Sequence, residues 1–223
     1  MNFQRSSFAA ALLGVFFVFR GILPAGEPPA GFKALLGSSL EGWFTIPGDS
    51  KDWSIDGEGN LACRGGKSYL WSEEEYGDFV LDLEVNLSEG CNSGVFIRTD
   101  PKNPIQGGFE IQVIDSAGKE EMEKDDFGAF YDAVAPLVNA AKPAGAWNRM
   151  VIRWEGAKLT VLLNGKKVQE LSVDDWTAAH YNPDGSWNKF RTALKDLPRK
   201  GHIGFQNHGH DVWYRNVFIR ALD

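Results

Sequence analysis

The sequence has few side chains of the kinds that hold metals or carry redox chemistry. Its 223 residues include only two cysteines and four histidines. A structural zinc site takes four Cys or His ligands at short, regular spacings, and no such spacing occurs. Cys63 and Cys91 can form a disulfide in an oxidising compartment, or can both be small buried hydrophobic residues. Zinc-finger-like proteins are therefore excluded, and the pairing of the cysteines stays open.

Excess positive charge is lacking as well. The formal net charge is -7, and the acidic residues are spread rather than clustered. Proteins that bind nucleic acid present a basic face, so we expect no nucleic-acid partner. The chain also lacks a phosphate-binding glycine loop, a nucleophile elbow and a Cys/His dyad.

The chain has one long apolar run, at residues 8–19, which is too short to span a bilayer comfortably. It follows an arginine and precedes small residues, as in a secretory signal peptide. We predict a signal peptide over residues 1–25, a linker over 26–31 and one domain over 32–223. The mature protein would then be periplasmic or extracellular, without a membrane span. The alternative is an uncleaved membrane anchor.

The sequence also shows no long amphipathic helix, no internal repeat and no alternation of strands with helices. Instead, short runs of alternating apolar and polar residues lie between Gly, Pro and Asp turns. Strands are expected at 40–43, 52–61, 78–85, 94–98, 109–113, 147–154, 158–163, 167–171, 201–208 and 212–217. Residues 174–200 read as irregular, with at most one short helical turn. Eight Trp and fifteen Phe suit both a sandwich core and stacking against sugar rings. The pattern predicts an all-β fold of two antiparallel sheets, a sandwich or jelly roll.

The polar faces of these strands carry the candidate functional groups. Successive side chains of a strand alternate between its faces, so Gln206 and His208 lie opposite Ile203 and Phe205. By the same rule Glu110 shares a face with Gln112, Asn92 with Arg98, and Trp213 with Arg215. If these faces line one sheet, several polar groups meet in one cleft: Arg98, Glu110, Gln112, Tyr131, Gln206 and His208.

A carboxylate and an imidazole can divide the roles of base and acid at neutral pH, which suggests Glu110 and His208. Arg98 would supply fixed positive charge for a developing oxyanion. The structural alternatives are a Glu110 that is paired with an arginine and a His208 that is bonded to the backbone of a turn. The paired carboxylates of a Glu-x-Asp-x-x-Glu strand, usual in glucanases of this architecture, are missing.

Taken together, these features resemble a known family, the 3-keto-disaccharide hydrolase domain. The matching motifs span nearly all of residues 32–222. They include Leu40-Glu41-Gly42-Trp43, Tyr76-Gly77-Asp78-Phe79, Asn92-Ser93-Gly94-Val95-Phe96-Ile97-Arg98, Gly108-Phe109-Glu110-Ile111-Gln112, Gly128-Ala129-Phe130-Tyr131, Trp147-Asn148, Gly201-His202-Ile203-Gly204-Phe205-Gln206-Asn207-His208-Gly209 and Arg215-Asn216-Val217. Cys91 and Phe205 depart from the family pattern, but neither is a candidate catalytic group.

The resemblance implies a concanavalin-like jelly roll in an exported protein that cleaves glycosides oxidised at C3. A 3-keto group acidifies the C2 proton, so a base can form an enolate that expels the C1 substituent, and water addition completes net hydrolysis. We assign catalysis to Glu110, His208 and Arg98. Substrate binding is assigned to Asn92, Gln112, Tyr131, Trp147, Gln206 and Arg215.

Other readings stay open. A bound divalent metal, held by carboxylate and His ligands, could replace Arg98 as the electrophile. A lectin-like module that binds a glycan without chemistry explains the aromatic residues equally well, and it predicts an exposed Trp such as Trp71 or Trp187. A structural domain of a cell-surface assembly is the third option. Oligomeric state is not indicated by the sequence.

Overall fold

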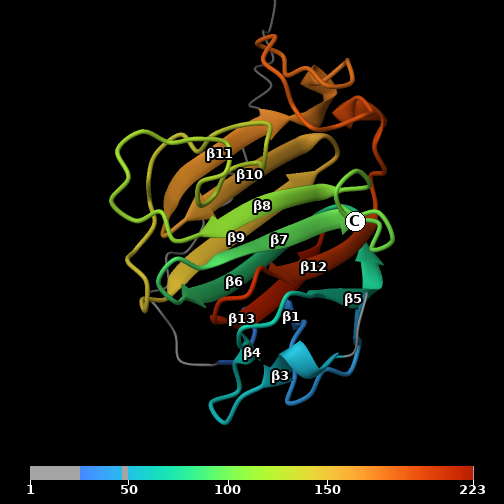
Figure 1. Cartoon of the computed structure of the whole chain (residues 1–223). Helices are drawn as coiled ribbons and strands as arrows, with labels where there is room; N and C mark the ends of the chain where they lie inside the picture. The colour runs from blue at the N-terminus through green and yellow to red at the C-terminus, as the bar shows by residue number, and fades with distance from the viewer. Residues whose placement is uncertain (1–25, 47–49, 223) are drawn as a thin grey trace, which may run out of the picture.

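The computed structural model describes residues 26–46 and 50–222, so the predicted signal peptide lies outside the described residues. Two sheets are formed, and every strand pairing in them is antiparallel. The sheets lie one over the other, with β7 and β8 in front of β9 and β6 in Figure 1. The predicted two-sheet antiparallel jelly-roll sandwich is therefore confirmed.

The two sheets differ in size. In order, the large sheet contains β11 (Lys166–Ser172), β10 (Lys158–Leu163), β9 (Asn148–Glu155), β6 (Phe79–Leu87), β13 (Val212–Ala221), β4 (Leu61–Cys63) and β3 (Trp53–Ile55), with β1 (Lys33–Ala34) also paired to β13. The small sheet contains β2 (Trp43–Thr45), β5 (Tyr69–Tyr76), β12 (Gly201–Asn207), β7 (Asn92–Thr99) and β8 (Phe109–Ile114). Helical structure in the described residues is limited to the 3-10 turns η1 (Ser50–Asp52), η2 (Val173–Asp175) and η3 (Leu194–Asp196).

Alternation of side chains builds the core between the sheets. Phe79, Leu81 and Leu83 of β6 point inward, and so do Phe109 and Ile111 of β8. This is the period of two that the sequence predicts for a half-buried strand. The side chains on the opposite face of each strand point away from the core. On the small sheet, these outward-pointing side chains form the candidate site.

Two strands were not foreseen from the sequence, the two-residue β1 and the long β5. The strand β5 contains Glu73, Glu74 and Glu75 in succession, a run that hides its strand character. All three are exposed, and they lie between the buried run Leu70–Ser72 and the buried Tyr76. The first half of β5 contributes Tyr69 and Trp71 to the candidate site.

The two cysteines are both buried and are not bonded to each other. Asn207 Nδ2 donates a hydrogen bond to Cys63 Sγ over 3.2 Å. Burial raises the pKa of Cys91 to about 12, so its thiol stays protonated at neutral pH. Of the two readings of the cysteines, the structure shows small buried side chains.

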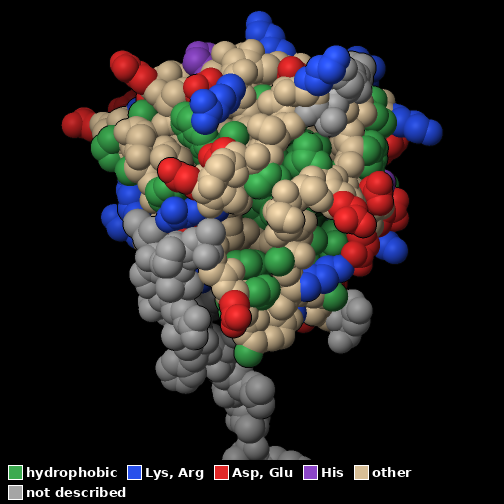
Figure 2. Space-filling model, turned by 90° about the horizontal axis from the view of Figure 1, so that it is seen from below, with side chains coloured by type: hydrophobic (Ala, Val, Ile, Leu, Met, Phe, Trp, Pro, Cys, Tyr) green, Lys and Arg blue, Asp and Glu red, His purple; other side chains and the backbone are tan. Residues whose placement is uncertain are grey.

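The end of the sandwich seen from below in Figure 1 has a mixed surface. Hydrophobic side chains are visible near the middle of this face, and side chains of both charges lie around them (Figure 2). Within residues 26–46 and 50–222, no helix has the length and apolarity needed to cross a membrane.

Candidate active site

The outer face of the small sheet carries two neighbouring rows of side chains. Strand register aligns each row across β5, β12, β7 and β8. The first row is Tyr69, Gln206, Gly94 and Gln112. The second row is Trp71, Gly204, Phe96 and Glu110. Equivalent positions in the two rows are two residues apart along a strand, about 7 Å.

Two glycines let large side chains lie flat on this face. A Cβ atom at Gly94 would overlap with Oε1 of Glu110, so the carboxylate extends over the Gly94 backbone toward the first row. A Cβ atom at Gly204 would overlap with the ring of Trp71 in the same way. Neither glycine has a positive φ, so each is required here for space rather than for backbone conformation.

Glu110 is buried, with 6% of its surface exposed. Burial raises the pKa of its carboxyl group to about 7, against the opposing effect of the Lys189 charge. Desolvation disfavours the charged form of a carboxyl group, which explains the direction of this shift. A carboxyl group with a pKa near the working pH is suited to removing and returning a proton.

Lys189 and Tyr131 are the neighbours of Glu110 on its outer side. The ammonium of Lys189 lies 4.1 Å from the centre of the Tyr131 ring. Burial lowers the pKa of Lys189, and the charge of Glu110 opposes that shift. The Tyr131 backbone N–H donates to the Glu110 carbonyl over 3.0 Å, which fixes Tyr131 beside the second row. The buried Glu110 carboxyl group and the half-buried Lys189 ammonium thus influence each other's pKa.

Amide and aromatic groups complete the first row. Gln206 Nε2 donates to the Tyr69 hydroxyl over 3.0 Å, and Gln112 Nε2 donates to Asn92 Oδ1 over 3.4 Å. Gln112 Oε1 and Trp71 Nε1 are buried and have no hydrogen-bond partner among the described residues. Buried polar groups are normally satisfied, so a water molecule or a polar ligand is expected to bond to these two atoms.

Trp71 does not form an exposed platform. It is fully buried, and it stacks on Tyr69 with ring centres 5.6 Å apart. The ring of Phe96 packs edge-on against it at 5.4 Å. The lectin reading named Trp71 or Trp187 as an exposed aromatic residue: Trp71 is not exposed, whereas Trp187 is.

His208 follows β12 on the same sheet as Glu110. Its backbone N–H donates to the Asn92 carbonyl over 3.1 Å, which puts it one row beyond Gln206. Burial lowers the pKa of the imidazole, and the charges of Lys67 and His210 lower it further. His208 is therefore predominantly neutral at pH 7, and it is accessible at the open end of the face.

The prediction that Arg98 faces this site is wrong. A bulge in the pairing of β7 with β12 interrupts the alternation of β7, and Arg98 has a φ of 49°. Its side chain turns into the protein, where it is fully buried and lies 4.6 Å from the Trp154 ring centre. It donates to Asp78 Oδ1 and to the carbonyls of Gly77 and Gly156. Arg98 thus has a structural role in the core.

Arg215 and Trp147 are not in this site either. The guanidinium of Arg215 lies 4.0 Å from the Trp147 ring centre, and its Nε donates to Glu84 Oε2 over 2.7 Å. Arg215 belongs to β13 and Glu84 to β6, so the pair lies on the outer face of the large sheet. The sandwich core separates it from Glu110. Asp82 lies on the same outer face and is paired with Arg149.

Tyr69, Trp71 and Lys189 are site residues that the sequence reasoning missed. The first two belong to the strand hidden by the glutamate run. Lys189 comes from the irregular segment between β11 and β12, where no periodicity indicates a direction. The alternation Tyr69-Leu70-Trp71 was a usable signal for the first two, whereas no local pattern marks Lys189.

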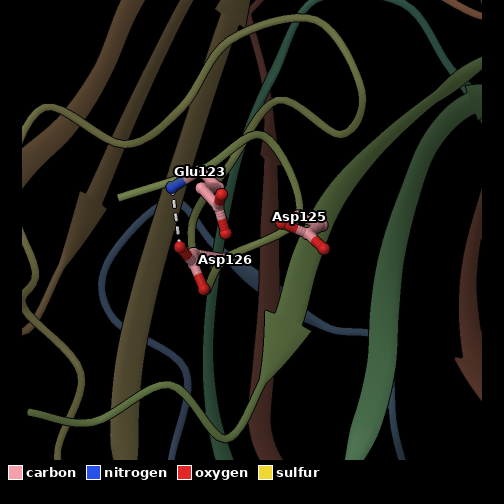
Figure 3. A group of neighbouring side chains, drawn as sticks. All are labelled: Glu123, Asp125 and Asp126. Atoms are coloured by element: carbon pink, nitrogen blue, oxygen red, sulfur yellow. Dashed lines mark hydrogen bonds between the residues drawn. The ribbon is translucent and has the colours of Figure 1, made fainter. Parts of the chain in front are cut away.

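Three acidic side chains gather in the loop that follows β8. Carboxylate oxygens of Glu123, Asp125 and Asp126 lie within 4.8 Å of one another (Figure 3). The ammonium of Lys119 lies 2.6 Å from Glu123 and 2.8 Å from Asp126, and the Glu123 backbone N–H donates to Asp126. Lys119 thus already pairs with two of the three carboxylates, as is usual for a surface acidic loop.

Comparison with known proteins places these features in context. The model of the 3-keto-alpha-glucoside-1,2-lyase-like domain family matches residues 31–220. A 3-keto-disaccharide hydrolase from Bacteroides thetaiotaomicron is 28% identical over 222 residues, covering 84% of this chain and 77% of that protein.

Solved structures give the same picture. A protein from Parabacteroides distasonis assigned as a glycosyl hydrolase is 34% identical, with a TM-score of 0.78 over 86% of this chain and 99% of its own. A second such protein from the same species is 25% identical, with a TM-score of 0.71 over 86% of this chain and 94% of its own. A carbohydrate-binding module from Bacillus subtilis, 16% identical with a TM-score of 0.54 over 83% of this chain and 99% of its own, shares the fold.

Proposed function

Because the chain belongs to the 3-keto-alpha-glucoside-1,2-lyase-like domain family, and its relatives include assigned glycoside-acting enzymes, we propose that it cleaves glycosides oxidised at C3. One observation carries this proposal: a buried carboxyl group with a pKa of about 7 that has no carboxylate partner in the two rows. A two-carboxylate glycosidase needs a second acid across the scissile bond. Elimination next to a ketone needs one base.

The reaction begins with proton abstraction. The C3 carbonyl acidifies the C2 proton, and the Glu110 carboxylate takes that proton as the C2–H bond breaks. The electron pair of the C2–H bond is taken up by the C3 carbonyl, which gives an enolate. The enolate then expels the C1 substituent as the C1–O bond breaks. The leaving oxygen takes up a proton from water, and the neutral imidazole of His208 can relay that proton from the solvent through its two ring nitrogens. Addition of water across C1–C2 then gives net hydrolysis.

Lys189 takes the role that the sequence reasoning gave to Arg98. The enolate oxygen develops negative charge in a site from which water is largely removed, and a nearby cation stabilises it there. Lys189 supplies a charge close enough to lower the pKa of Glu110, whereas Arg98 is enclosed in the core. The free atoms Gln112 Oε1 and Trp71 Nε1 would bind sugar hydroxyl groups.

One assay separates this function from its competitors. The protein is incubated with a 3-keto-glucoside and with the unoxidised parent glucoside, each with and without EDTA, and release of the substituent is followed. We expect release from the keto sugar alone, unaffected by EDTA. Cleavage of the parent sugar would indicate an ordinary glycosidase. Binding without release from either sugar would favour the lectin, and loss of activity in EDTA would give the electrophilic role to a metal ion rather than Lys189.

Replacing Gly94 with alanine tests whether the carboxylate must lie over this glycine. The new methyl group overlaps with Glu110 Oε1, so the carboxylate has to move. Misplacing a catalytic group by about 1 Å can cost 10²-fold in rate, and we expect a kcat loss of roughly that size. Gly57→Ala is the matched control, because a Cβ atom there meets nothing within 4 Å. Equal kcat values for the two variants would show that the position of Glu110 is not critical.

We further propose that the protein is exported by residues 1–25. The apolar run and the small residues after it support this proposal. Sequencing the mature N-terminus after expression in a bacterial host tests it, and a start near residue 26 is expected. A protein that still begins at Met1 in the cytoplasmic fraction would contradict it.

A further inference from the structure

The segment between β11 and β12, drawn in orange at the top of Figure 1, contains a small hairpin that holds two exposed aromatic residues. Tyr181 and Trp187 face each other across its bridge. Their exposed fractions are 55% and 61%, although most large apolar side chains of this protein are buried. Exposed aromatic rings on a fixed scaffold are typical of binding surfaces.

The hairpin is anchored to the core. Asn182 Oδ1 accepts hydrogen bonds from Trp176 Nε1 over 2.7 Å and from Asn188 Nδ2 over 2.9 Å. Both asparagines and Trp176 are buried. The backbone pairs His180 with Phe190 and with Asn188. The aromatic residues are therefore presented by a structure that does not have to be ordered on binding.

The indole of Trp187 has one supported face. The imidazole of His180 stacks against it with ring centres 6.1 Å apart and planes inclined by 11°. Stacking on one side, with most of the surface still exposed, leaves the other side of the indole open. A flat open aromatic face is complementary to the apolar C–H face of a pyranose ring.

The hairpin continues directly into the candidate active site. Lys189 follows Trp187 by two residues, and its backbone is fixed by Asp132 Oδ2 at 2.5 Å and by Gln106 Nε2 at 3.0 Å. Lys124 Nζ donates to Ser186 Oγ over 2.9 Å and to the Trp187 carbonyl over 3.3 Å. The segment between β11 and β12 thus places the Lys189 ammonium beside Glu110 and the Trp187 indole outside the candidate active site.

A hollow of about 580 Å³ lies next to this segment, and its lining includes Lys124, Asp125, Tyr131 and Asp132. Lys124 and Asp132 are both hydrogen-bonded to the segment. Small-molecule sites commonly have volumes of this size. Tyr131 lines the hollow, and its backbone N–H donates to the Glu110 carbonyl, so it links the hollow to Glu110. The carboxylates and the ammonium in its wall suit sugar hydroxyl groups.

We propose that Trp187, with Tyr181 and this hollow, forms a distal subsite for the second sugar ring of a disaccharide substrate. The proposal rests on the proposed function for the position of the first ring, which lies beside Glu110. The second ring then stacks on the open face of Trp187, and the wall of the hollow binds its hydroxyl groups. The enzyme thereby distinguishes disaccharides from glycosides with a small substituent.

Binding without chemistry gives the first test. Maltose and methyl α-glucoside, neither oxidised, are titrated into the wild type, Trp187→Ala, Trp187→Phe and Leu137→Ala by NMR. Leu137 is a matched exposed apolar residue, 60% exposed, in the segment before β9. We expect the wild type to bind maltose about 5- to 10-fold more tightly than methyl α-glucoside, the size of one stacking contact. Trp187→Ala should lose this preference, Trp187→Phe should keep part of it and Leu137→Ala all of it.

Turnover gives the second test. The ratio of kcat/KM for 3-keto-maltose to that for methyl 3-keto-α-glucoside should fall 5- to 10-fold in Trp187→Ala, mostly through KM. If no keto sugar is cleaved but the maltose preference still depends on Trp187, the proposed function fails and the subsite stands. If the wild type binds both sugars equally, or Trp187→Ala keeps the preference, the subsite is refuted whatever the enzyme does.

Discussion

Replacing Glu110 with glutamine is expected to lower kcat on a 3-keto-glucoside by about 10²–10⁴-fold, the usual cost of losing a general base. Glutamine keeps the shape of the side chain but cannot accept the C2 proton. In the wild type, kcat/KM should rise with pH through the Glu110 pKa of about 7 and then level off, because the carboxylate is the active form. The pH profile and the variant together identify the base.

The same variant should be more stable than the wild type. The folded protein keeps the Glu110 proton up to a pH of about 7, whereas the unfolded chain releases it near the ordinary glutamate pKa of 4.5. Between these values the folded state binds more protons, so the free energy of unfolding falls as pH rises. Above pH 7 the ionised, buried Glu110 lowers the free energy of unfolding by about 3 kcal/mol, and Glu110→Gln should recover up to that amount.

Glu84→Gln is the matched control. Glu84 is also buried, but on the outer face of the large sheet, where its carboxylate is the partner of Arg215. Its replacement leaves Arg215 without that partner, so stability should fall while kcat is kept. Chemical denaturation at pH 8 measures both variants. A Glu110→Gln protein that is active, or that is less stable than the wild type at pH 8, would contradict the role we give to this carboxyl group.

Replacing Lys189 with methionine is expected to lower kcat by about 10²–10³-fold, as loss of one preorganised charge at an oxyanion does. Methionine fills the space beside Tyr131, and the backbone bonds to Asp132 and Gln106 do not involve the side chain. Lys189→Arg keeps the charge and should recover part of the rate.

A second measurement separates this charge effect from a merely structural one. The Lys189 charge lowers the pKa of Glu110. Its removal in Lys189→Met should therefore move the acid limb of the kcat/KM profile to higher pH, and Lys189→Arg should leave that limb near its original position. An unshifted acid limb in the methionine variant would show that Lys189 does not act on Glu110.

The regular parts of the fold were predictable because alternation is a local property of a strand. Phe79, Leu81 and Leu83 indicate both the strand β6 and its buried face, and the face shared by Glu110 and Gln112 follows from the same rule. The side of the sheet is thus readable wherever a strand is regular.

The errors come from features that alternation does not contain. Arg98 lies in a bulge, which reverses the direction of its side chain without changing its sequence parity. Arg215 has the expected parity, but parity does not say which of the two sheets a strand joins. Lys189 reaches the site from an irregular segment through long-range bonds to Gln106 and Asp132, and no local pattern encodes those contacts.

The most direct test of the account is hydrogen exchange at C2. A 3-keto-glucoside is incubated with enzyme in deuterated water, and deuterium at C2 of recovered substrate and product is followed by NMR. The wild type should introduce deuterium at C2 of the product, and Glu110→Gln should do so at least 10²-fold more slowly. Release of the C1 substituent by the wild type with the original hydrogen retained at C2 would show that the bond is cleaved without removal of that proton, and would contradict the mechanism.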